Sequence, residues 1–145
     1  MTTIAYRNRI LAADTSMISS YNIMPRAMTK ITADHGCLAG AAGSASYAAA
    51  FLRWFRTGEA GDPPKAVRDD NSHDMGMIVR PDGSVTVYDS GGWYEFRTEY
   101  FAMGSGRDQA FGAMFAGANA EGAVRAAIAH DPGTAGDVDV LRLDG

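Results

Sequence analysis

Short strand-like runs joined by tight turns are the feature that most restricts the fold of this chain. Residues 2–7 and 9–14 are rich in β-branched and apolar side chains, and Arg7-Asn8-Arg9 between them predicts a hairpin. Pro81-Asp82-Gly83 predicts another, because proline presets φ and glycine accepts a positive φ. A hairpin pairs neighbouring strands antiparallel, so the sequence favours antiparallel sheets.

Helical spacing of apolar residues predicts three helices among these strands. They are expected at 44–56, 107–118 and 120–130. Further strands are expected at 28–32, 36–42, 75–80, 84–89, 93–103 and 137–143. Residues 58–70, with two glycines and Pro63-Pro64, predict a surface loop. Helices must cover the faces of antiparallel sheets, so this order predicts an α+β sandwich.

Length and composition narrow the class of protein. The 145 residues suit a single domain, 1–145. A net charge of −4 with scattered basic residues disfavours nucleic acid as a partner. Cys37 is the one cysteine, which excludes an internal disulfide and fits a reducing compartment. The sequence has no bilayer-length apolar run and no secretory signal pattern, so we expect a cytoplasmic protein without a membrane partner.

Thr2 is the first residue that suggests chemistry. Removal of Met1 would leave a residue that carries both a hydroxyl and a free α-amine. Such an amine has a pKa of roughly 7.7–8.0, so it can accept the hydroxyl proton near neutral pH. Lys30 could hold the amine neutral by like-charge repulsion, and Asp14 could keep that lysine charged and oriented. Each of these residues also has an ordinary structural interpretation, in a turn or on a solvated strand.

Several segments in order resemble the proteasome β subunits and the bacterial heat-shock-locus threonine peptidase. The segments are Met1-Thr2-Thr3-Ile4, Ala12-Ala13-Asp14-Thr15, Thr29-Lys30-Ile31, Leu38 to Ala45, Phe101 to Gly106, and Asp131 to Val140. The resemblance implies a four-layer αββα sandwich of antiparallel sheets. It also implies a threonine-type N-terminal nucleophile hydrolase that cleaves peptide or amide bonds without a cofactor.

The resemblance implies a role for each matching position. Thr2 would be the nucleophile, tuned by Asp14 and Lys30, and the Gly43 N–H would form the oxyanion hole. The polar network beside the amine would consist of Ser105, Asp131 and Thr134. Substrate would lie as an added strand along Ser16 to Ser20, and Ala41 and Ala45 would line a roomy specificity pocket.

The loop at 58–70 departs from this family, which has a second long helix there. We therefore expect a sandwich that is reduced on one helical layer. The implied partners are further copies of the chain, as a ring or a dimer, and an ATP-dependent unfoldase. Two other functions stay open: a non-catalytic assembly subunit, including one of phage origin, and a small-molecule amidase.

Other reactive residues carry weaker signals. His35, His73 and His130 lack metal-ligand spacing, so no metal site is expected, and Gly136, Asp137 and Asp139 only weakly suggest a cation. Cys37 in a strand is typical of a small buried apolar residue. Ala102 breaks the pattern that a serine-hydrolase elbow around Ser105 would need.

Overall fold

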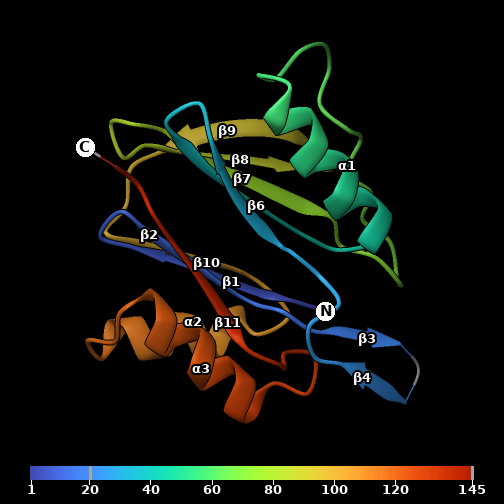
Figure 1. The fold of residues 1–145 in the computed structure, drawn as a ribbon, viewed down its shortest axis with the longest axis vertical. Helices are drawn as coiled ribbons and strands as arrows, with labels where there is room; N and C mark the ends of the chain where they lie inside the picture. The colour runs from blue at the N-terminus through green and yellow to red at the C-terminus, as the bar shows by residue number, and fades with distance from the viewer. Residues whose placement is uncertain (20, 145) are drawn as a thin grey trace.

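Two antiparallel sheets lie between helical layers in the computed structural model, which describes residues 1–19 and 21–144 (Figure 1). One sheet has the order β10-β1-β2-β11, with β10 (Tyr100–Gly104), β1 (Thr3–Arg7), β2 (Ile10–Asp14) and β11 (Val138–Arg142). The other has the order β5-β6-β7-β8-β9, with β5 (Ile31–Asp34), β6 (Cys37–Ala42), β7 (Met75–Val79), β8 (Val85–Asp89) and β9 (Gly92–Phe96). β3 (Met17–Ser19) and β4 (Asn22–Met24) form a small separate hairpin.

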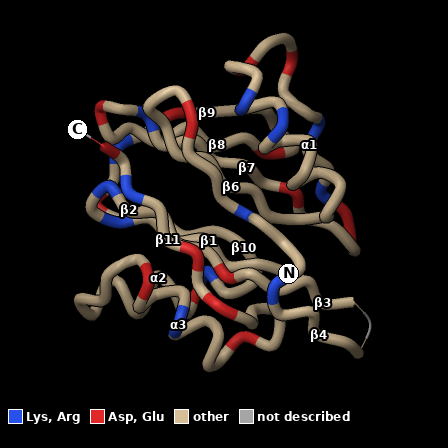
Figure 2. Tube along the Cα trace, viewed as in Figure 1, with Lys and Arg blue, Asp and Glu red and all other residues tan. Residues whose placement is uncertain are grey.

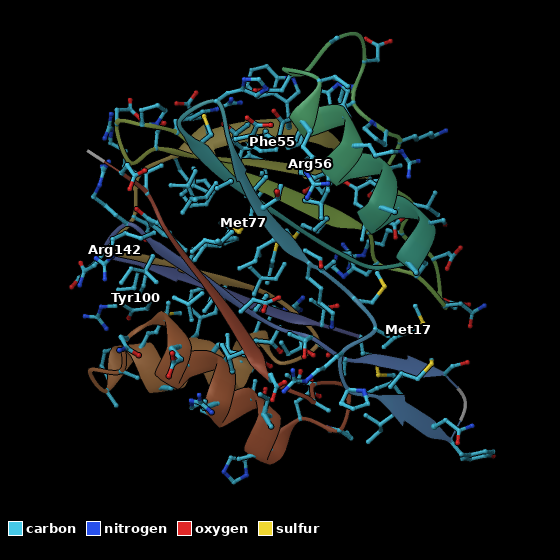
Figure 3. All side chains as sticks on the ribbon, in the orientation of Figure 1. Met17, Phe55, Arg56, Met77, Tyr100 and Arg142 are labelled. Atoms are coloured by element: carbon cyan, nitrogen blue, oxygen red, sulfur yellow. The ribbon has the colours of Figure 1, made fainter. Side chains whose placement is uncertain are left out.

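Three apolar clusters fill the three spaces between the four layers. The period of two along a strand explains how one strand serves two of them. In β1, Ile4 and Tyr6 face the five-stranded sheet, whereas Ala5 faces the helices. Met77 likewise lies between the two sheets (Figure 3). The expected αββα sandwich is therefore confirmed.

One helix covers the five-stranded sheet, and two cover the other. α1 (Ala45–Arg56) begins at Ser44, whose Oγ accepts the N–H of Tyr47 at 3.2 Å, and it buries Phe51 and Phe55 against the sheet. α2 (Arg107–Phe115) and α3 (Ala120–His130) pack on the four-stranded sheet. Residues 58–70 form no helix, so the expected reduction of one helical layer is confirmed.

The predicted turns are present. Asn8 (φ 52°) and Arg9 (φ 64°) form the two-residue connection between β1 and β2, and such positive φ values fit the twist of paired strands. At the β7–β8 turn Gly83 has φ 85°, and Asp82 Oδ1 accepts the Ser84 N–H at 2.9 Å.

The structure differs from the sequence prediction in the positions of three strand segments and in the end of one helix. Residues 93–103 are two strands in different sheets, because the polar run 97–99 carries the chain from one sheet to the other. No strand was assigned to residues 15–26, but part of this segment pairs as β3 and β4. The strand expected at 28–32 begins only at Ile31, and α2 ends at Phe115 rather than 118.

Candidate active site

A buried ion pair lies at the centre of the site. Asp14 ends β2, Lys30 immediately precedes β5, and Lys30 Nζ lies 3.0 Å from each carboxylate oxygen of Asp14. Their side chains are only 0% and 3% exposed, so each charge depends on the other for solvation. Burial lowers the pKa of Lys30, and the negative charge of Asp14 opposes this shift only in part.

The Asp14 carboxylate also fixes the backbone around the start of the chain. Oδ1 accepts the Thr3 N–H at 3.0 Å, and Oδ2 accepts the Ser16 hydroxyl at 3.0 Å and the Ala135 N–H at 3.2 Å. One carboxylate thus ties together β1, the segment after β2 and the segment before β11. This explains why a charged group is tolerated here at zero exposure.

Lys30 reaches the peptide bond that precedes Thr2. Its Nζ donates to the Met1 carbonyl oxygen at 3.1 Å, and that carbonyl carbon is bonded to the Thr2 nitrogen. Thr2 itself is 6% exposed. Burial lowers the pKa of the Met1 amine, and the positive charge of Lys30 lowers it further, against the opposing charges of Asp14 and Asp131. An amine in this region is therefore biased toward its neutral form.

A chain of hydrogen bonds runs along the other side of Thr2. Ser105 Oγ donates to Asp131 Oδ2 at 2.7 Å and lies 3.3 Å from the Thr2 carbonyl oxygen. The Thr134 hydroxyl donates to the same Asp131 oxygen at 2.5 Å and lies 2.6 Å from the Thr3 hydroxyl. Burial alone would raise the pKa of Asp131, but the bonds from Thr134, Ser105 and Gly133 outweigh it and lower that pKa.

Asp74 is a residue at the site that the sequence did not reveal. Its carboxylate is buried and accepts the Ser44 N–H at 2.9 Å, the Val67 N–H at 3.0 Å and the Ser72 hydroxyl at 3.0 Å. It therefore fixes the Gly43-Ser44 turn. Gly43 has φ 116°, and a Cβ there would overlap the Asp74 carboxylate and main chain, so only glycine fits.

Among the described residues, the Gly43-Ser44 turn has one backbone N–H that is free to donate, that of Gly43. The Ser44 N–H is taken by Asp74, whereas within residues 1–19 and 21–144 the Gly43 N–H donates to no other group. No sequence signal joins Gly43 to Asp74, because their contact depends on the pairing of Ala42 with Met75 across β6 and β7.

Two cavities flank Thr2. The β3-side cavity has a volume of about 240 Å³ and is lined by Ser16, Met17, Met28, Ala41 and Ala45, among others. The α2-side cavity has a volume of about 330 Å³ and is lined by the loop 71–73, Met75, Ser105 and Arg107. Met1, Thr2, Gly43 and Ser44 line both.

The structure brings most of the predicted site residues together. Thr2, Asp14, Lys30, Gly43, Ser105, Asp131 and Thr134 all lie around the start of β1. Of the four residues predicted to bind substrate, Ala41, Ala45 and Ser16 line the β3-side cavity, although the Ser16 hydroxyl points to Asp14. Ser20 lies outside the described residues. The roles of all these residues stay predictions.

The described part of the chain contains no recognisable metal-ligand cluster or bilayer-spanning helix. Within it, no group of three His, Cys, Asp or Glu side chains lies close enough to hold a metal ion. No helix among the described residues is long and apolar enough to span a bilayer. Lys and Arg are interspersed with Asp and Glu along the trace (Figure 2).

Comparison with solved structures places this fold among known ones. BPH of Thiobacillus denitrificans, in a complex with epoxomicin, superposes with a TM-score of 0.69 over 99% of each chain at 19% sequence identity. HslV from Trypanosoma brucei superposes with a TM-score of 0.71 over 99% of each chain at 15% identity.

The chain shares the fold of BPH and HslV. A second structure of Thiobacillus denitrificans BPH agrees, with a TM-score of 0.69 over 99% of this chain and 98% of that one at 18% identity. No family model and no curated protein matches the sequence. The similarity to these proteins is therefore one of three-dimensional fold.

Proposed function

We propose that the chain, acting as one domain over residues 1–145, is a threonine-type N-terminal nucleophile hydrolase that cleaves peptide or other amide bonds. The observation that carries this proposal is the position of Lys30. Held by both oxygens of Asp14, its Nζ lies 3.1 Å from the carbonyl of the bond whose cleavage frees the Thr2 amine. Cleavage of this bond makes Thr2 the terminal residue.

The proposed reaction has two halves that share one base. The freed α-amine of Thr2 takes the proton of its own hydroxyl, and Oγ forms a bond to the substrate carbonyl carbon. The carbon–nitrogen bond then breaks, the amine returns the proton to the leaving nitrogen, and an ester on Thr2 remains. Water, deprotonated by the same amine, hydrolyses that ester and restores the hydroxyl.

The residues around Thr2 supply the electrostatics of this scheme. Lys30 repels a proton on the amine, and this keeps the base neutral. The free Gly43 N–H is suited to stabilise the oxyanion, a contribution of about 2.7–4 kcal/mol for a well-placed donor. Ser105, Asp131 and Thr134 hold the first residues of β1 by the hydrogen bonds already described.

The β3-side cavity is proposed to take the side chain on the acyl side of the cleaved bond. Its lining includes Met17, Ile18 and Met28 together with three alanines, and its one charged side chain, Lys30, is neutralised by Asp14. We therefore expect large apolar side chains such as Leu or Phe to be favoured. Ser16 and the β3 residues that follow it would pair with the substrate backbone.

Turnover of peptides tests the proposal. The protein whose Met1 is absent by intact mass is incubated with internally quenched peptides that carry Leu, Phe or Lys before the cleaved bond, and with a small apolar anilide. Thr2→Ala is the matched control and should abolish turnover of each compound. Turnover of the anilide alone would indicate an amidase, and a Thr2→Ala rate equal to that of the original chain would refute the proposal.

A further inference from the structure

The two cavities meet around the start of the chain. Met1 is 68% exposed and lines both of them, together with Thr2, Gly43 and Ser44. Under the proposed function, the bond to be cleaved lies at Thr2. The acyl fragment of the substrate then lies on one side of Thr2, and the leaving amine fragment lies on the other. The acyl fragment is proposed to occupy the β3-side cavity, which Ala41 and Ala45 line. The leaving fragment therefore lies in the α2-side cavity.

The lining of the α2-side cavity has one charged side chain, Arg107, and no carboxylate. The ion pair of Arg107 with Asp108 is long, 3.9 Å from Nε to Oδ1, and the Asp108 side chain is 93% exposed, so it holds the guanidinium only weakly. Two buried acids adjoin the lining and are already occupied. Asp74, between His73 and Met75, accepts three hydrogen bonds, and Asp131 is bound by Ser105 and Thr134. Asn71 and His73 add polar groups to the lining.

We propose that the α2-side cavity binds the leaving fragment of the substrate and selects a carboxylate in it, with Arg107 as the specificity-determining residue. A guanidinium presents a planar set of donors that matches both oxygens of a carboxylate. The carboxylate could be an Asp or Glu side chain just after the cleaved bond, or the C-terminal carboxylate of a one- or two-residue leaving fragment. This inference rests on the proposed function.

A matched set of quenched peptides tests it. The peptides share one acyl side and carry Asp, Asn or Lys directly after the cleaved bond. Two further peptides are designed for cleavage one residue before the C-terminus. One of them has a free C-terminal carboxylate and the other an amidated C-terminus. The expected order of kcat/KM is Asp over Asn over Lys, with roughly fivefold or more between the extremes, as for opposite and like charges in a cleft.

Variants of Arg107 test whether this residue causes the preference for Asp over Lys. Arg107→Gln should remove the preference for Asp over Lys, and Arg107→Glu should reverse it. Arg125→Gln is the matched control, because Arg125 is an exposed residue of α3 paired with Glu121, and it should keep the preference. The two further peptides show whether a terminal carboxylate is recognised as well as a side chain.

The failures can be told apart. If no peptide is cleaved by the chain that lacks Met1, the proposed function fails and this inference fails with it. If the peptides are cleaved with equal kcat/KM for Asp and Lys, only the inference fails. If the preference for Asp survives in Arg107→Gln, the assignment to Arg107 is overturned.

Discussion

At the scale of single residues, the site depends on charges that are buried in pairs. Asp14 and Lys30 are almost without solvent contact, so removing one charge leaves the other exposed to a low dielectric. Asp131 is stabilised by hydroxyl groups rather than by a cation side chain. These two carboxylates therefore respond differently to substitution and to pH.

Lys30→Met should destabilise the protein by roughly 3–5 kcal/mol, because it leaves the buried Asp14 carboxylate without its counter-charge. The double variant Lys30→Met, Asp14→Leu should recover a large part of that loss, since it removes both charges. Denaturation in urea measures both free energies of unfolding. A single variant as stable as the original chain would contradict the buried pair.

Asp131→Asn should lower the free energy of unfolding by about 1–3 kcal/mol at neutral pH, because charged hydrogen bonds are lost. The pKa of Asp131 is lower folded than unfolded, so its contribution is fully present above the unfolded value of roughly 3.9. It disappears as the pH falls through the folded pKa. Unfolding curves between pH 7 and pH 2 should show the two proteins converge in acid, and a constant difference would refute this.

At the scale of elements, the turn between β6 and α1 is controlled by a distant segment. Asp74 lies directly before β7 and bonds both Ser44 of the turn and Val67 of the preceding loop. The loop between α1 and β7 therefore supports the turn that carries the candidate oxyanion donor, the Gly43 N–H. A substitution at Asp74 should affect catalysis through the Gly43-Ser44 turn.

Asp74→Ala should reduce kcat by about tenfold or more, with a smaller change in KM. The upper limit is the roughly 10²–10³-fold loss of kcat that follows removal of a whole oxyanion donor. Asp69→Ala is the control: Asp69 caps the same loop through Asn71 and Ser72 but does not touch the turn. Steady-state kinetics with one good peptide compares them. Equal kcat values in the two variants would exclude the positioning role of Asp74.

The elements that the sequence predicted well are those with local signals. The turn residues at 7–9 and 81–83 and the aromatic spacing of α1 act within a few residues, and all three are present in the structure. The hairpin of β3 and β4 escaped prediction because its segment is polar and contains Pro25. Asp74 and Thr3 escaped because their contacts join residues far apart in the chain.

At the scale of the whole molecule, the β3–β4 hairpin presents an apolar surface to solvent. Tyr21 is 101% exposed, Ile23 57% and Met24 38%, on a two-stranded unit that is weakly stable alone. Exposed apolar groups of this kind mark interaction sites. We expect this surface to contact further copies of the same chain, the partners that the resemblance of the sequence implies.

We expect the chain to sediment as an oligomer, and Ile23→Ser with Tyr21→Ser should shift it toward the monomer, because the substitutions remove apolar contact area. Val67→Ser is a control, since Val67 is also exposed, at 44%, but belongs to the loop between α1 and β7. Sedimentation velocity at several concentrations measures this. A monomer at all concentrations in the unaltered chain would contradict the expectation.

The most direct test of the account is to ask whether Thr2 becomes a reactive N-terminal residue. The protein, expressed from Met1, is treated with epoxomicin, and intact and tandem mass spectrometry locate any adduct. The account predicts loss of Met1 and a single adduct on Thr2 that is absent from Thr2→Ala. Retention of Met1 in the natural host, or a processed Thr2 that stays unmodified, would contradict it.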